Sequence, residues 1–222
     1  MALIREVRGH TPVIGENTFL AETAVILGDV TIGRDCSIWY NAVLRGDVNK
    51  IVIGDRTNIQ DGAVLHTIYD KAKHPSQTII GNDVSVGHNA VVHGARIGDN
   101  CLIGMGAILL DNAVIPSGCI IAAGALVLSN AQLEPDSLYA GVPAKRIRAV
   151  TPEQREDLIL SFLRSEGCRI GSDVKISRGA YRCLVNADFS DNIAGLRACV
   201  TNCCAKAFLN REGDYVVVRP YL

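Results

Sequence analysis

Residues 97–127 read IGDNCLIGMGAILLDNAVIPSGCIIAAGALV, and a large aliphatic side chain returns at every sixth position of this stretch: Ile97, Ile103, Leu109, Ile115, Ile121 and Val127. We call each of these residues a rung. Four residues after a rung stands a small or compact side chain, as in Cys101, Ala107, Ala113, Cys119 and Ala125. A helix would repeat its apolar residues about every 3.6 positions and an alternating strand every two, so a period of six fits neither.

The same period occurs upstream, with rungs at Ile14, Leu20, Ile26, Ile32, Ile38 and Leu44, then after an offset at Ile53, Ile59 and Leu65, and again at Ile80, Val86 and Val92. Hexapeptide repeats of this kind are a signature of parallel β-helices. Each unit forms a short strand and a tight turn, and three units close one triangular coil. We expect the rung and the small residue to point inward, and the glycine that often follows a rung to take the turn. The sequence therefore predicts an all-β parallel β-helix.

Three segments are expected along the chain. Residues 1–150 form the β-helix domain, with an extra loop from about Thr67 to Gln77. Residues 151–166 form a C-terminal α-helix, because Thr151 is a good N-cap and Pro152 suits the first helical position. Residues 167–222 show no hexapeptide period and form a tail of unassigned structure, in which residues 215–218 are compatible with a strand.

Composition narrows the class of protein. The 22 basic and 23 acidic residues are balanced and no basic cluster stands out, which argues against nucleic-acid binding. No signal-peptide core and no membrane-spanning apolar stretch is present, so we expect no membrane partner and a cytoplasmic location. Three of the eight cysteines occupy the small inward slot as compact free thiols, and the five tail cysteines match no zinc motif.

Two histidines are expected to stack. Leu65 and Val92 lie three faces apart, which places them on the same face in adjacent coils. His66 and His93 follow these rungs and should therefore stand about 5 Å apart at the backbone, the spacing of paired strands. Arg45 follows rung Leu44 in the same way, so it should lie one coil below His66.

A third histidine is expected near the adjacent corner. His88 lies two residues after Val86, directly above Asp61, which lies two after Ile59. Packing of such prisms side by side as a trimer would bring His88 to the His66–His93 pair. Three neutral imidazoles with an open position suit a catalytic zinc ion. The alternative is a set of scattered surface histidines, which the shared register disfavours; His10 and His74 lack such placement and are expected to be solvated.

Five short motifs carry a resemblance to the gamma-class carbonic anhydrase family, most of all to its short bacterial YrdA-like branch: residues 45–47 (RGD), 58–62 (NIQDG), 64–66 (VLH), 86–88 (VGH) and 92–94 (VHG). The resemblance covers roughly residues 10–165. It implies a left-handed β-helix homotrimer with one metal ion at each subunit interface. Its implied ligands are His66 and His93 from one subunit and His88 from the neighbour.

The resemblance also implies roles for four further residues. Gln60 would hydrogen-bond the metal-bound solvent, and Arg45, Asp47 and Asp61 would form ion pairs across or beside the interface. For Arg45 and Asp47 a structural role is as open as a catalytic one, because a bidentate Arg–carboxylate pair fixes subunit rotation.

The implied activity is the reversible hydration of carbon dioxide to bicarbonate by a metal-bound hydroxide, with Zn²⁺ as the expected cofactor and Fe²⁺ or Co²⁺ as alternatives. Two departures from the archaeal prototype of the family put fast turnover in doubt. Val48 stands where the prototype has a carboxylate, and the loop at 67–77 has no glutamate. Only Asp70 and His74 in that loop are left to carry protons.

Two other functions stay open. Residues 139–145 (YAGVPAK) resemble the end of hexapeptide acyltransferases, which favours acyl or thioester chemistry on CoA esters. Those enzymes generally use one histidine as base rather than three metal ligands. A non-catalytic metal-binding assembly subunit is the third reading.

Overall fold

The computed structural model describes residues 1–69, 77–151, 159–160, 162–164, 167, 173–186, 192–209 and 215–218. It divides into two compact units, Met1–Ala149 and Val150–Leu222. The first unit carries all the predicted repeats and all the predicted site residues.

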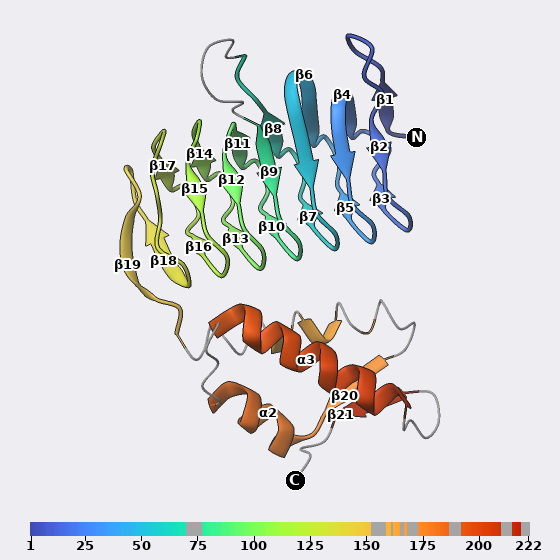
Figure 1. Cartoon of the computed structure of the whole chain (residues 1–222), viewed down its shortest axis with the longest axis vertical. Coiled ribbons are helices and arrows are strands. Elements are labelled where there is room, and N and C mark those ends of the chain that lie inside the picture. The colour runs from blue at the N-terminus through green and yellow to red at the C-terminus, as the bar shows by residue number, and fades with distance from the viewer. Residues whose placement is uncertain are drawn as a thin grey trace. The chain divides into compact units, whose positions relative to one another are not determined.

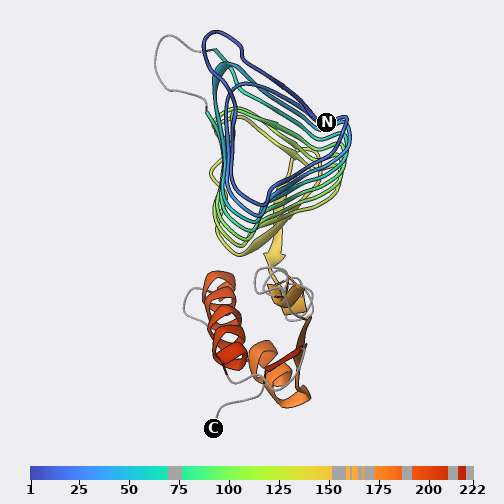
Figure 2. The same cartoon turned by 90° about the vertical axis from the view of Figure 1, so that its right-hand side faces the viewer.

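The first unit is a left-handed parallel β-helix of triangular cross-section (Figure 1, Figure 2). Its strands run in the order β1 (Leu3–Arg5), β2 (Val13–Ile14), β3 (Phe19–Leu20), β4 (Val25–Ile32), β5 (Ser37–Ile38), β6 (Val43–Ile53), β7 (Asn58–Ile59), β8 (Val64–His66), β9 (Thr78–Ile80), β10 (Ser85–Val86), β11 (Val91–His93), β12 (Arg96–Ile97), β13 (Leu102–Ile103), β14 (Ile108–Leu109), β15 (Val114–Ile115), β16 (Ile120–Ile121), β17 (Leu126–Val127), β18 (Ser137–Ala140) and β19 (Lys145–Ala149). The long strands β4 and β6 each span two rungs and join two faces into one sheet, while β18-β16-β13-β10-β7-β5-β3 form the third face. Strand β19 departs from the parallel pattern and pairs antiparallel with β18 at the end of the prism.

The period of six is confirmed in the register of the coils. Leu44 pairs with Leu65, Leu65 with Val92, and Val92 with Leu109. These rungs are fully buried. The small residues that follow two other rungs by four positions, Ala63 after Ile59 and Ala90 after Val86, are fully buried as well. Burial of one large aliphatic side chain stabilises a fold by about 1.5–3 kcal/mol, so the stacked rungs supply the core of the prism.

Two neighbouring isoleucines on β9 test this account of the core. Ile80 is 1% exposed inside the prism, whereas Ile79 points outward and is only partly buried. We expect Ile80→Ala to lower the free energy of unfolding by about 2–5 kcal/mol, because it leaves a cavity in a packed interior. Ile79→Ala is the matched control and should cost clearly less. Urea unfolding of both variants measures the difference, and equal losses would contradict the inward assignment of the rung.

The glycine after a rung can open the turn, as Gly87 does by accepting from the N–H of Ala90 at 3.1 Å, but it does not occupy the left-handed position of the turn. The left-handed turn positions are held by residues such as Asn89, Asn100 and Asn112, with φ of 56°, 56° and 59°. Gly33 instead lies against the next coil, where an added Cβ would come within 2.7 Å of the backbone carbon of Gly54. These glycines are therefore required by the close stacking of coils rather than by turn geometry.

The offset in the rung series is a bulge at one corner. Gly28 pairs with Gly46, but the next ladder pair joins Val30 to Ile51. Residues 47–50 therefore lie opposite Asp29 alone. This extra length changes the wall of the prism close to the predicted site.

The second unit has a small buried cluster of its own, which includes Ile159, Phe162, Leu163, Val200, Cys204 and Val216. It contains β20 (Asp173–Ile176), α2 (Arg178–Asn186), α3 (Asn192–Leu209) and β21 (Tyr215–Val218), and the two strands pair parallel. Of the helix predicted at 151–166, residues 159–160 and 162–164 are helical and most of the others lie outside the described residues. Asp70 and His74 also lie outside the described residues. Among the helices described, none is long and apolar enough to cross a membrane.

Candidate metal centre

A stacked pair of histidines lies on the outer surface of the β6-β8-β11 face. His93 on β11 pairs in register with His66 on β8, as the rung count predicts. The two ring centroids lie 5.1 Å apart, and Nδ1 of His66 is 3.1 Å from Nε2 of His93. Their side chains are 15% and 31% exposed. The strand pairing therefore holds two imidazoles within reach of one small ligand.

Arg45 and Asp47 lie beside His66, on the side of the pair that faces the preceding coil. Nη1 of Arg45 donates to Oδ2 and Oδ1 of Asp47 at 2.9 and 3.1 Å. Oδ1 of the same carboxylate is 3.1 Å from Nε2 of His66. One carboxylate thus joins the guanidinium to the histidine.

Opposing effects set the pKa values of this acid and this base. Burial raises the pKa of Asp47, but hydrogen bonds from His66 and Arg45 outweigh burial and hold it below its ordinary value. Burial lowers the pKa of His66, and although Asp47 opposes this, the nearby Arg45 charge adds to it, so the net shift is downward. The neutral imidazole, which is the form that binds a metal, is therefore favoured at His66.

Asp111 lies beside His93, on the side of the pair that faces the following coil, and is not among the residues predicted from the sequence. Nδ1 of His93 is 2.7 Å from Oδ1 of Asp111. Asp111 lies two residues after Leu109, the rung that pairs with Val92 one coil below. A carboxylate accepts hydrogen bonds, so Nδ1 of His93 is the donor and its Nε2 carries a lone pair. Counting coils places Asp111 one coil after His93 along the prism. It does not show that the Asp111 side chain extends to the His93 ring.

His88 and Asp61 form a separate pair near the end of the β7-β10 face. Val86 pairs with Ile59, which brings Nδ1 of His88 to 3.0 Å from Oδ2 of Asp61. Both side chains are close to half exposed. Gln60 precedes Asp61 on this face, and its backbone N–H donates to the carbonyl of Val86 at 2.9 Å. The structure thus joins His88 to Asp61, with Gln60 next to Asp61 along the chain.

One chain does not assemble all three predicted ligands. Within the described residues no three histidine, cysteine or acidic side chains are grouped so as to hold a metal ion. The donor chemistry of His66 and His93 fits zinc, iron or cobalt, but the pair supplies only two imidazoles. A site of three imidazoles would need a third from outside this pair.

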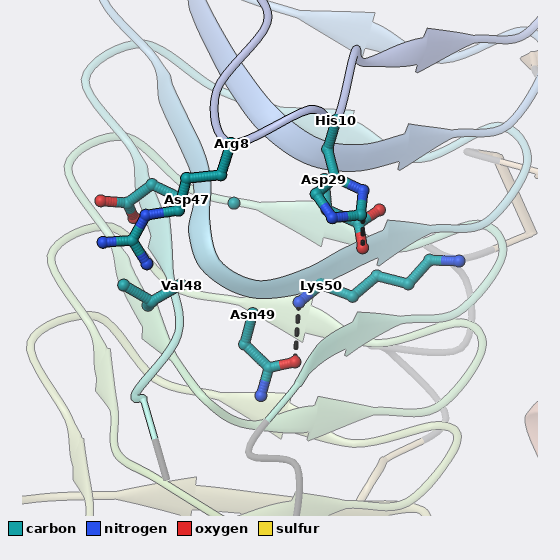
Figure 3. Close-up of a pocket in the computed structure, with 8 residues that line it drawn as sticks. Arg8, His10, Asp29, Asp47, Val48, Asn49 and Lys50 are labelled. Atoms are coloured by element: carbon teal, nitrogen blue, oxygen red, sulfur yellow. Dashed lines mark hydrogen bonds and ion pairs between the residues drawn. The ribbon is translucent and has the colours of Figure 1, made fainter. Parts of the chain in front are cut away.

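A cavity of about 260 Å³ lies at the bulge, lined by Arg8, His10, Asp29, Gly46, Asp47, Val48, Asn49 and Lys50 (Figure 3). Asp47 belongs both to this lining and to the hydrogen-bond partners of His66, so the cavity adjoins the histidine pair. His10, which the sequence places in solvent, is exposed, and its Nδ1 lies 3.9 Å from Oδ2 of Asp29. Val48 is part of the wall.

The chain is similar to known proteins over its β-helix. The family described as "Bacterial transferase hexapeptide (six repeats)" matches residues 11–46, 77–111 and 94–129. A probable carbonic anhydrase of Methanocaldococcus jannaschii is 52% identical over 151 residues, which are 68% of this chain and 92% of that protein. Protein YrdA of Escherichia coli is 42% identical over 158 residues, or 70% of this chain and 86% of that protein.

Two further similar proteins carry different descriptions, one as a carbonic anhydrase and the other as an acetyltransferase. Gamma carbonic anhydrase 1, mitochondrial, of Arabidopsis thaliana is 44% identical over 64% of this chain, which spans 52% of the length of that protein. The crystal structure of a Bacillus cereus protein described as an acetyltransferase by inference is 40% identical, with a TM-score of 0.67, and the match covers 77% of this chain and 92% of that one.

Proposed function

The chain belongs to the gamma-class carbonic anhydrase family, and on that premise we propose that it catalyses the reversible hydration of carbon dioxide to bicarbonate at a metal ion shared between the subunits of a homotrimer. The observation that carries the proposal is the in-register His66–His93 pair, whose ring nitrogens lie 3.1 Å apart. Both imidazoles are also held by carboxylates of the same chain, which is typical of metal-binding histidines.

In the proposed site His66 and His93 of one subunit and His88 of the next hold the ion, with Zn²⁺ expected and Fe²⁺ or Co²⁺ as alternatives. When bound, such an ion acts as a Lewis acid and lowers the pKa of water to about 7. Gln60 lies on the same face as His88, so the subunit that contributes His88 also contributes the amide that orients solvent. Asp61 holds His88, and the Arg45–Asp47 pair holds His66.

Exposed apolar side chains beside both histidine groups support a trimer. Val64 and Ile108, which are 37% and 39% exposed, each pair in register with Val91 next to the His66–His93 pair. On the other face Leu102 and Met105 are 42% and 59% exposed, and Met105 lies one coil above His88. Contiguous exposed apolar surface marks an interaction site. We place the first patch of one subunit against the second patch of its neighbour, which brings His88 to the pair.

Proton export is expected to limit the rate, because Val48 supplies no proton acceptor at the position where the resemblance implies a carboxylate. We predict that Val48→Glu raises the hydration rate of metal-loaded protein by about 10-fold or more, since positioned acid–base groups contribute about 10²–10⁴-fold. Val48→Gln is the matched control, because glutamine has the shape of glutamate but cannot accept a proton at neutral pH. Stopped-flow hydration with and without imidazole buffer measures both effects. No response to either, with metal bound, would argue that carbon dioxide is not the substrate.

Two specific findings keep an acyltransferase as the second candidate: the YAGVPAK segment at 139–145 and the acetyltransferase description of the similar Bacillus cereus protein. The two functions differ in what the purified protein binds. A hydrating enzyme needs bound metal and no CoA ester, whereas an acyltransferase binds acetyl-CoA and works without metal. Metal analysis, acetyl-CoA titration and a hydration assay on one preparation distinguish them. Bound metal without hydration would favour the non-catalytic assembly subunit.

A further inference from the structure

We propose that Asp111 is a positioning residue of the metal centre, which holds His93 through Nδ1 so that the lone pair of Nε2 faces the ion. This inference rests on the proposed function for the ion itself. It adds a residue that lies outside the five motifs that identify the family.

The contact is the shortest of the three between a predicted ligand and a carboxylate. Nδ1 of His93 lies 2.7 Å from Asp111, against 3.1 Å for His66 and Asp47 and 3.0 Å for His88 and Asp61. A separation of about 2.7–2.9 Å is typical of a charge-assisted hydrogen bond. Asp111 is 25% exposed, so solvent competes for only part of its carboxylate.

The backbone around Asp111 is held on both sides by neighbouring coils. The N–H of Asn112 donates to the carbonyl of Gly94 at 2.8 Å, and the carbonyl of Asp111 accepts from the N–H of Asn130 at 2.9 Å. The turn beside His93 is thus tied to the coil below and to the coil above. The carboxylate consequently has a defined position relative to His93.

Asp111 also differs from Asp47 in its surroundings. The carboxylate of Asp47 is shared between Arg45 and His66, and it lies in the bulge of β6. Asp111 lies on the regular part of the prism, where its carboxylate contacts His93. It is therefore the carboxylate best placed to select one tautomer of a ligand histidine, which orients the ring and raises its affinity for metal.

Asp111→Ala and the near-isosteric Asp111→Asn test this inference. We expect Asp111→Ala to weaken zinc binding by about 10–100-fold in competition with a chelator, the usual effect of losing such a partner, and Asp111→Asn to weaken it less. Asp99→Asn is the matched control, because Asp99 also lies in a turn and accepts from the N–H of Asn82 at 2.6 Å, away from the histidines. Its zinc affinity should equal that of the wild type.

A second readout does not depend on the metal. In metal-free wild-type protein, ¹⁵N NMR should show His93 protonated on Nδ1, and Asp111→Ala should lose this preference while its melting temperature stays close to that of Asp99→Asn. Wild-type zinc affinity in Asp111→Ala, or a proton on Nε2 of His93 in the metal-free wild type, would overturn the inference. Zinc binding without carbon dioxide hydration would refute the proposed function and leave Asp111 in its role. A wild type that binds neither zinc nor iron nor cobalt would overturn the inference together with the proposed function.

Discussion

Replacing His93 by alanine is expected to strip the metal from the purified protein, from about one ion per chain to none, and to reduce carbon dioxide hydration to background. The reason is the arrangement of donors. His66 and His93 are the only two imidazoles that the described part of one chain brings within hydrogen-bond distance of each other, at 3.1 Å. With one of them gone, two imidazoles from different subunits remain, and a structural or catalytic zinc site needs at least three protein ligands. Elemental analysis of the purified variant measures the loss.

The same loss is expected for His66→Ala and for His88→Ala, although His88 lies on another face. His10→Ala is the control, since His10 is exposed beside Asp29 and belongs to neither histidine group. With the metal removed from all of them, the four variants should keep the melting temperature of the metal-free wild type, because none removes a rung. Full metal retention in His93→Ala would rule out the assigned site.

The core of the prism and the stacked histidines could be predicted because both follow from one short period. Once every sixth residue points inward, the height and face of each rung follow by counting, and His66 and His93 inherit the register of Leu65 and Val92. No long-range information is needed, since each coil packs only on its neighbours. The same count placed His88 above Asp61.

The count does not give what depends on side-chain reach or on departures from the period. Asp111 reaches a histidine on the coil below, and only the direction of its side chain shows this. The cavity next to Asp47 exists because residues 47–50 bulge out opposite Asp29, which the sequence shows only as a gap between rungs. The glycines after the rungs looked like turn residues, yet Gly33 is there because another coil is too close for a Cβ.

The second unit could not be predicted for a different reason. The helix α3 (Asn192–Leu209) contains apolar residues without a clear 3.6 period, so no face of it stands out in the sequence. The parallel pairing of β20 with β21 joins residues about forty positions apart, and no local signal reports such a contact. Only β21 was visible, as the apolar run at 215–218.

The metal site shared between subunits is the central claim. A mixing experiment tests it through the recovery of metal by two variants that bind none alone. Chains carrying His88→Ala and chains carrying His66→Ala with His93→Ala are refolded together in equal amounts. Each variant alone should form trimers without a complete site. In a cyclic trimer every interface is head-to-tail, so a complete site forms only where the His88→Ala chain meets the double variant in one order.

Metal content after mixing is the measurement that decides. Random assembly gives each interface a chance of one half times one half, so about a quarter of the wild-type metal content should return, together with hydration activity in the same proportion. Native mass spectrometry verifies that mixed trimers are present. If all three histidines served one chain, or if His88 were no ligand, mixing would not produce this recovery from two metal-free parents. Verified mixed trimers that bind no metal would contradict the intersubunit site.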